Sequence, residues 1–331
     1  MNIIAKLRKV SQPSKRGKEM CRDRILLTGS SGLIGTSLVR SLMRKQISMV
    51  SLLRQPLPEA LNAGSSMVSQ ELWDPYSATP VSRPRSLDGT TAAVHLSGAN
   101  LAGQRWTSSY KRKILESRVK PTHALATILA SLRPKPAVLV CASAIGIYGS
   151  RGEELLTEGS LPGSGFLPEL CLAWEQATQP AADAGIRVVH LRFGVALSPN
   201  GGALAQMLPI FRAGLGGRLG SGRQWMSWVM LPDVIRAIEF ALQTASLSGP
   251  VNVVAPNPVT NLEFTRSLGR ILHRPVLLHV PAFALRLAFG EMAEATILES
   301  ERVVPACLQA AGFDFEHPEL EAGLRAVLQK S

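Results

Sequence analysis

The chain has 331 residues, enough for one large α/β domain or two domains of ordinary size. Hydrophobic residues make up 46% and charged residues 18%, a balance that predicts a substantial buried core and argues against long disordered regions. No apolar stretch approaches the roughly 20 residues that cross a bilayer, so we expect no membrane span and no membrane partner.

The net charge is +12, which raises the question of a nucleic-acid partner. The first 24 residues carry eight Lys or Arg and two acidic residues, so half of the net charge lies in this N-terminal segment, which ends where the first expected strand begins. The rest of the chain has no stripe of interleaved basic and aromatic residues, and we therefore do not expect nucleic-acid binding. We interpret residues 1–22 as a basic N-terminal tail, which is a solvated extension, an organelle-targeting segment or a polyanion-binding segment.

Four cysteines are present, with no Cys-x-x-Cys pair and no spacing typical of a metal finger: Cys21, Cys141, Cys171 and Cys307. We therefore expect no metal site. The basic tail also lacks an apolar stretch of secretory-signal length, so a reducing cytoplasm is the expected location.

The first elements along the chain form one repeating unit. Residues 24–28 (RILLT) are an apolar run that leads directly into glycines, and residues 33–45 then show apolar residues at helical spacing. Residues 48–53 read as a second strand. A strand, a helix and a strand within about 30 residues are typical of a βαβ crossover between parallel strands.

The same alternation continues toward the middle of the chain. It predicts strands at 92–96, 137–141 and 187–191, a helix over 107–132 that Pro121 could interrupt, and a helix over 166–184. Repeated βα units predict an α/β fold of the Rossmann type, a doubly wound parallel sheet with helices on both faces. We assign this dinucleotide-binding domain to residues 23–195.

The pattern changes after residue 195. Residues 198–224 are rich in glycine and short on periodicity, which is typical of loops over a site or of a small lobe. A helix starting at Asp233, which we expect to cap it, and a strand at 251–254 indicate some return to the sheet around residues 228–255. The last 70 or so residues read as helices separated by prolines. We assign most of residues 196–331 to a smaller C-terminal substrate lobe.

The glycine turn at residues 28–35 (TGSSGLIG) is the firmest functional signal. A Gly-x-x-Gly-x-x-Gly pattern indicates a dinucleotide site here because it follows a strand, opens a helix and lies in a βαβ unit. Gly29 permits the tight turn, Gly32 lets the backbone approach a pyrophosphate, and Gly35 allows close packing of helix and strand. The phosphates would lie over the free N–H groups at the helix start, so we expect a bound dinucleotide.

The end of the second strand indicates which dinucleotide is bound. Forms that bind NAD place an acidic residue there for the ribose 2′-hydroxyl, but no acidic residue occurs from Ser41 to Pro58. The strand ends on Arg54 instead. A guanidinium pairs well with a 2′-phosphate, so the sequence favours NADP(H) over NAD(H).

The motifs together resemble the extended short-chain dehydrogenases/reductases, the sugar-nucleotide epimerase group, and within it the "epimerase family" proteins. The resemblance covers roughly residues 23–328 and implies a Rossmann sheet with a smaller C-terminal lobe, the two framing a cleft, and often a homodimer. It rests on the glycine turn, Trp73-Asp74, Ser97-Gly98, Arg105-Trp106-Thr107 with Ser117-Arg118 downstream, and the stretches Leu208–Gln224, Ala255–Phe264 and Ala311–Phe315.

The same resemblance implies a set of cofactor contacts. An acidic residue at the Asp74 position usually meets the adenine in extended members, whereas Trp73 is as readily a core aromatic. The implied contacts are Gly29, Ser31, Gly32, Leu33, Ile34, Arg54, Trp73, Asp74, Ser97 and Gly98.

The proton-transfer residues of this superfamily are missing. Its members use a Tyr-x-x-x-Lys pair, in which the lysine lowers the pKa of the tyrosine. None of the three tyrosines of this chain is followed four residues later by a lysine, and the two positions fall on Leu167 and Cys171. Ser143, at the position resembling the catalytic serine, and Tyr148 are the remaining catalytic candidates. His95 reads as a buried, hydrogen-bonded residue.

Two interpretations follow. The first is an NADP(H)-dependent oxidoreductase or nucleoside-sugar epimerase that acts on an unknown small molecule and uses a non-standard proton donor. The second is a catalytically silent NADP(H)-binding protein, a sensor or scaffold. The sequence does not name a substrate in either case.

Overall fold

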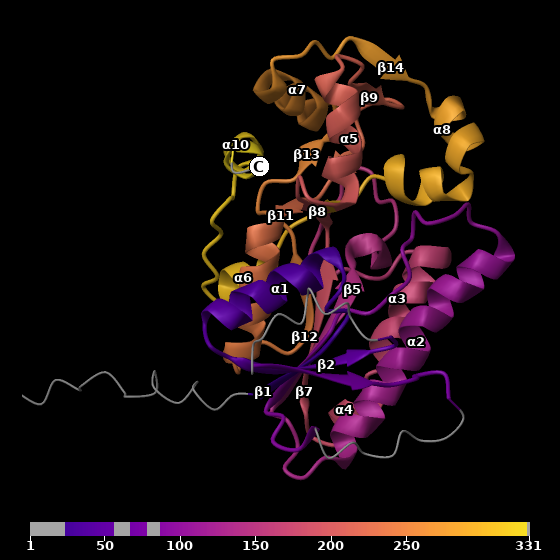
Figure 1. The fold of residues 1–331 in the computed structure, drawn as a ribbon. Coiled ribbons are helices and arrows are strands. Elements are labelled where there is room, and N and C mark those ends of the chain that lie inside the picture. The colour runs from indigo at the N-terminus through magenta and orange to yellow at the C-terminus, as the bar shows by residue number, and fades with distance from the viewer. Residues whose placement is uncertain (1–23, 56–66, 78–86, 330–331) are drawn as a thin grey trace, which may run out of the picture.

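The computed structural model describes residues 24–55, 67–77 and 87–329 (Figure 1). The basic segment 1–22 lies outside the described residues. Among the helices of the described ranges, none is both long enough and apolar enough to cross a membrane.

A seven-stranded sheet forms the centre of the molecule, and all of its neighbouring strands pair in parallel. The strand order confirms the expected doubly wound, Rossmann-type sheet, because the chain adds strands first on one side of β1 and then on the other. In spatial order the strands are β12 (Gly249–Val253), β7 (Arg187–Phe193), β5 (Val138–Ala144), β4 (Ala92–His95), β1 (Arg24–Thr28), β2 (Ser48–Leu53) and β3 (Val68–Leu72).

Helices cover the sheet on both faces, with α1 (Leu33–Arg44) and α6 (Leu231–Gln243) on one and α2 (Ser108–Ser131), α3 (Phe166–Gln176) and α4 (Gln179–Asp183) on the other (Figure 1). Leu38 and Ile238 belong to the apolar core of the first face, and Leu125 and Ala181 to that of the second. Because both faces are covered, the strands are apolar runs rather than alternating patterns.

Two expected helices have different limits in the structure. α2 continues through Pro121, because buried residues on both sides of the proline, Ile114 and Leu125, pack well enough to offset a cost of about 3 kcal/mol. The helix expected over 166–184 is divided into α3 and α4, and Pro180 stands in the first turn of α4, where its missing N–H costs nothing.

Most of the remaining chain builds a smaller lobe above the sheet (Figure 1), whereas the segment that contains Leu308 and Phe313 packs into the apolar core of the first face. The glycine-rich stretch 198–224 is not only loops, because it contains α5. The elements outside the sheet and its helices are η5 (Ile145–Ile147), β6 (Leu155–Leu156), β8 (Val195–Leu197), α5 (Gly202–Arg212), β9 (Gly217–Leu219), β10 (Trp225–Met226), β11 (Trp228–Met230), β13 (Val259–Thr260), α7 (Asn261–Leu272), β14 (Leu278–Val280), α8 (Ala282–Phe289), η6 (Ala293–Ile297), β15 (Arg302–Val303), α9 (Ala306–Ala310) and α10 (Leu320–Gln329).

Asp233 does not cap a helix, contrary to the sequence expectation. α6 begins at Leu231, so Asp233 lies inside its first turn and is fully buried. Its two carboxylate oxygens accept hydrogen bonds from the backbone N–H groups of Glu316 (2.8 Å) and His317 (2.9 Å). The carboxylate therefore ties the C-terminal segment to α6.

Candidate functional site

The sheet has a topological switch point at β1. β1 pairs with β2 on one side and with β4 on the other, so the connections that follow these strands leave in opposite directions. A crevice forms at the carboxyl ends of the strands where this happens, and it is the usual ligand site of such sheets.

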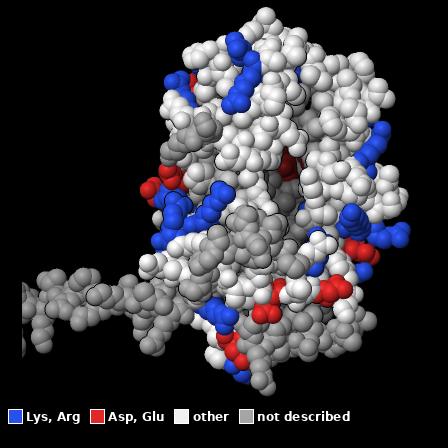
Figure 2. Space-filling view, viewed as in Figure 1, with Lys and Arg blue, Asp and Glu red and all other residues white. Residues whose placement is uncertain are grey.

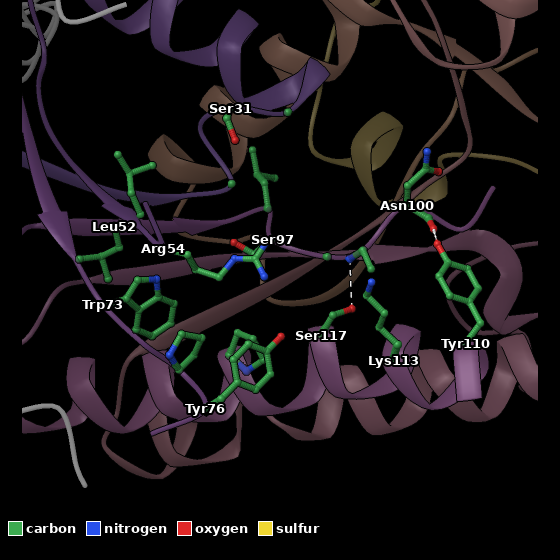
Figure 3. Close-up of a pocket in the computed structure, with 18 residues that line it drawn as sticks. Ser31, Leu52, Arg54, Trp73, Tyr76, Ser97, Asn100, Tyr110, Lys113 and Ser117 are labelled. Atoms are coloured by element: carbon green, nitrogen blue, oxygen red, sulfur yellow. Dashed lines mark hydrogen bonds between the residues drawn. The ribbon is translucent and has the colours of Figure 1, made fainter. Parts of the chain in front are cut away.

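A cavity of about 440 Å³ occupies this crevice (Figure 3). Residues from the carboxyl ends of four strands line it, although these segments are far apart in the sequence. Of the ten predicted cofactor contacts, seven line it: Gly29, Ser31, Gly32, Arg54, Trp73, Ser97 and Gly98.

The other three predicted contacts do not line the cavity with their side chains. Leu33 and Ile34 pack against the apolar core beneath α1. Asp74 is exposed, and its carboxylate accepts a hydrogen bond from the backbone N–H of Tyr76 (3.0 Å). The backbone N–H groups of Leu33 and Ile34 nevertheless stand at the start of α1, beside the glycine turn.

Each of the three glycines in the turn is required for a different structural reason. Gly29 has a φ of +72°, and a Cβ there would lie 2.6 Å from the carbonyl carbon of Leu96. At Gly35 a Cβ would lie 2.1 Å from the carbonyl oxygen of Gly29. At Gly32 the nearest atom is 3.5 Å away, so this glycine leaves space above the helix start for a ligand.

The start of α1 offers unused hydrogen-bond donors. Gly32 is the N-cap and has no side chain to satisfy the first N–H groups, and the first turn of α1 contains no acidic residue. Ser30, within the same turn, is buried, and its hydroxyl makes no hydrogen bond with any described residue. Unused donors at a helix start attract anions, so the turn suits a phosphate group.

Sequence reasoning missed the wall that α2 contributes. Tyr110, Lys113 and Ser117 line the cavity from α2, and Tyr76 and Asn100 line it from loops. Figure 3 shows Arg54 reaching into the cavity from β2, with Tyr76 and Lys113 on the opposite side. The spacing of Tyr110, Lys113 and Ser117 along the sequence is consistent with one side of a helix, but it does not show whether that side faces the cavity or solvent.

The cavity has a basic end. A second cavity of about 330 Å³ adjoins it, and its lining includes Arg54, Arg112 and Lys113 together with one acidic residue, Glu116, which pairs with Lys120 (3.2 Å). Within the described ranges, neither Arg54 nor Lys113 forms an ion pair with a carboxylate. Elsewhere on the face in Figure 2, Lys and Arg are scattered among acidic residues, and a hollow lies between the lobe and the sheet.

The two catalytic candidates lie in one buried network rather than on the cavity wall. Ser143 is 2% exposed, and its hydroxyl donates to Glu175 (2.7 Å). Tyr148 is fully buried, donates to Asn252 (2.7 Å), and accepts from Arg192 (2.9 Å). Because both hydroxyls are already hydrogen-bonded within the protein, the structure gives these two residues the surroundings of a structural network.

The centre of this network is the ion pair of Arg192 and Glu175, whose side chains are 8% and 12% exposed. The two groups make a bidentate contact with distances of 2.9 and 3.0 Å. Burial works against the carboxylate, but the hydrogen bonds and charge of Arg192 outweigh it and lower the pKa of Glu175. Burial also raises the pKa of the Tyr148 hydroxyl, so that hydroxyl stays protonated.

The two residues that the sequence analysis assigns to the Tyr-x-x-x-Lys positions are also buried. Leu167 is 7% exposed and contacts Gly146. Cys171 is 2% exposed, and burial raises the pKa of its thiol to about 12, so it is a neutral thiol. Neither side chain is a proton donor of the superfamily's kind.

His95 has the buried, hydrogen-bonded position that its sequence context indicated. One ring nitrogen contacts the Thr28 hydroxyl (2.6 Å) and the other contacts the Thr122 hydroxyl (2.9 Å). Burial lowers the pKa of His95 to about 4. The ring is therefore neutral at physiological pH and joins β1, β4 and α2 beneath the cavity.

This burial predicts a pH-dependent stability. Below the unfolded-state pKa of about 6.5 the unfolded chain binds a proton that the folded chain does not, so stability falls as the pH drops toward 4. We expect the His95 contribution to decrease by about 2 kcal/mol between about pH 7.5 and pH 5. Urea unfolding at both pH values measures it, and His95→Gln should remove that part of the difference. An unchanged difference in the variant contradicts the assignment.

Among known protein families, the model of the NAD dependent epimerase/dehydratase family matches residues 25–254, more than half of the chain. The chain belongs to this family. A second model, a domain of unknown function (DUF1731), matches residues 280–327, which extend from just before α8 into α10.

Relatives of this epimerase-family chain are similar over most of their length. An epimerase family protein of Mycobacterium tuberculosis is 42% identical over 294 residues, covering 88% of this chain and 93% of the relative. The "epimerase family protein SDR39U1 homolog, chloroplastic" of Arabidopsis thaliana is 34% identical over 313 residues, covering 92% of this chain and 86% of the relative.

Two solved structures share the fold closely. The human epimerase family protein SDR39U1 (isoform 2), crystallised with NADPH, has a TM-score of 0.83 at 30% identity and covers 93% of this chain and 100% of its own. A nucleoside-diphosphate sugar epimerase from Corynebacterium glutamicum has a TM-score of 0.74 at 34% identity, covering 92% of this chain but 58% of its own.

Proposed function

We propose that this epimerase-family protein binds NADP(H) in the cavity at the switch point of the sheet. The observation that carries the proposal is the convergence, in one cavity, of the glycine turn, the end of β2 and the loop after β4. A dinucleotide has a diphosphate between two nucleosides, and the open start of α1 with its unused donors fits that diphosphate.

The basic end of the cavity supports the phosphorylated dinucleotide. Arg54 and Lys113 approach the space between β2 and α2 from opposite sides, and neither has a carboxylate partner among the described residues. A 2′-phosphate would provide a negative charge for these two side chains, since the Glu116 carboxylate in the same lining pairs with Lys120. The human relative crystallised with NADPH agrees with this choice of cofactor.

Reversing the charge at Arg54 tests the preference. We expect Arg54→Glu to raise the Kd for NADPH about 30-fold or more, because a charge-assisted pair is replaced by repulsion, and to change the Kd for NADH less than about threefold. Titration calorimetry with both nucleotides measures the two values. Arg40→Glu, an exposed arginine farther along α1, controls for the change in net charge. Equal weakening of NADPH and NADH would disprove the 2′-phosphate assignment.

For the reaction, we propose an oxidoreductase or epimerase activity on a small molecule with a proton path other than Tyr-x-x-x-Lys. A bound nicotinamide supplies or accepts a hydride. The chain's own residues bind and orient it, while Leu167 and Cys171 exclude water and transfer no proton at neutral pH. Ser143 and Tyr148 maintain the fold beneath the cleft through the network around Glu175.

A single-turnover assay separates this enzyme from a silent NADP(H)-binding protein. Protein loaded with NADPH is mixed with a panel of carbonyl compounds, protein loaded with NADP⁺ is mixed with a panel of sugar nucleotides, and the absorbance of the reduced nicotinamide is followed in both. Loss of this absorbance with a carbonyl compound, or its appearance with a sugar nucleotide, identifies an enzyme and its substrate class. Tight cofactor binding without either change favours the sensor or scaffold, which the buried Leu167 and Cys171 make the second candidate.

A further inference from the structure

Arg118 on α2 is a buried cation without a counter-charge. Its side chain is 8% exposed, and no carboxylate within the described ranges pairs with it. Two of the five N–H donors of a guanidinium have carbonyl acceptors here, Nη1 with Ile114 (3.1 Å) and Nη2 with Ala99 (3.0 Å). Burying a charge costs free energy unless the charge is paired and hydrogen-bonded, so a further hydrogen-bond acceptor or an anion would stabilise Arg118.

The guanidinium lies directly behind the wall of the dinucleotide cavity. A Cβ on Gly98, which lines that cavity, would lie 3.1 Å from the central carbon of the Arg118 guanidinium. Ser117 and Arg118 also hold the neighbouring peptide, because the N–H of Ala99 donates to the Ser117 hydroxyl (3.0 Å; Figure 3) while its carbonyl accepts from Arg118. Arg118 thus lies directly beside the wall residues Gly98, Ala99 and Ser117, although it does not itself line the cavity.

The same guanidinium faces the helix that lacks the expected lysine. It lies 5.0 Å from the centre of the Trp174 ring on α3. Its charge also acts on Cys171, one turn earlier, where it opposes the effect of burial on the thiol's pKa. Cys171 occupies the position at which the superfamily carries the lysine of Tyr-x-x-x-Lys. The Arg118 guanidinium therefore lies near the position at which the lysine of the superfamily would stand.

We propose that Arg118 supplies from α2 the positive charge that a lysine would supply from α3, and that it donates hydrogen bonds to the hydroxyls of the nicotinamide-side ribose. This rests on the proposed binding of NADP(H). Arg118 is a positioning residue, because a guanidinium stays protonated and transfers no proton. Arg54 and Arg118 then act on opposite halves of the dinucleotide.

The test compares ligands that contain one or both halves. Arg118→Gln is expected to raise the Kd about tenfold for NADPH and for 2′-phospho-ADP-ribose, which both contain the second ribose, because a charged hydrogen bond is lost. The Kd for adenosine 2′,5′-bisphosphate, which lacks that ribose, should not change. Arg118→Lys should retain part of the affinity, and it serves as the test variant if Arg118→Gln does not fold.

A matched control separates ligand contact from stability. Arg187 is likewise held by backbone carbonyls, those of Ala241, Leu242 and Leu247, and lies away from the cavity. Arg187→Gln should lower the melting temperature but leave all three Kd values unchanged. In a swap, Arg118→Gln combined with Cys171→Lys should recover most of the lost NADPH affinity, since the charge returns from α3.

Three results would overturn the inference: equal weakening of all three ligands, an unchanged NADPH affinity in Arg118→Gln, or a folded swap variant that binds no better than Arg118→Gln. A different result would contradict the proposed function: the unmodified protein would bind none of the three ligands.

Discussion

Replacing Gly29 with alanine should abolish measurable NADPH binding and lower the free energy of unfolding by about 3 kcal/mol. The φ of +72° disfavours any side chain, and the new Cβ would lie 2.6 Å from the carbonyl carbon of Leu96 and 2.9 Å from the N of Ser97. The backbone after β1 or after β4 has to shift, and both segments line the cavity. Denaturant unfolding and NADPH titration measure the two effects.

Gly89 and Gly32 separate the causes of this loss. Gly89 has a φ of +80° with nothing within 4 Å, so Gly89→Ala adds the conformational strain without the clash and should cost about 1 kcal/mol with normal binding. Gly32→Ala meets only ordinary contacts and should fold normally yet bind NADPH more weakly, because its methyl group occupies the space above the helix start. Normal NADPH binding by Gly29→Ala would contradict the assignment of the turn.

The second large effect is expected in the buried network behind the cleft. Arg192→Met should lower the free energy of unfolding by about 3–5 kcal/mol, because it leaves the Glu175 carboxylate buried without its partner. The hydroxyl of Tyr148 loses the same donor. Chemical denaturation at neutral pH measures the loss.

A double variant distinguishes an unpaired charge from lost packing. Arg192→Met with Glu175→Leu removes both charges and should be more stable than Arg192→Met alone. Tyr148→Phe should cost about 1–3 kcal/mol, because the buried Asn252 and Arg192 each lose a partner, and should leave NADPH binding intact, as expected of a residue outside the cavity. A large effect of Tyr148→Phe on NADPH affinity with no effect on stability would return this tyrosine to the catalytic candidates.

The sequence alone determined those features of this protein that depend on neighbouring residues in the chain. The glycine turn with Gly29 and Gly35, the alternation of strands and helices, and Arg54 at the end of β2 each depend on residues within one βαβ unit. A short unit of this kind permits few arrangements, because parallel strands need a crossover and the crossover has one preferred hand. The family model confirms the family resemblance, and the strand order together with the solved relative confirms the Rossmann-type sheet.

The tertiary structure alone decided which polar groups are free and which are already bonded. Tyr148 is bonded to Asn252, 104 residues away, and Ser143 to Glu175, so a serine and a tyrosine that read as catalytic candidates are engaged inside the fold. Conversely, Lys113 faces the cavity from α2, and Arg118 is buried behind Gly98. The burial and hydrogen bonding of a side chain depend on partners brought together by folding, and the spacing of residues along one helix does not contain that information.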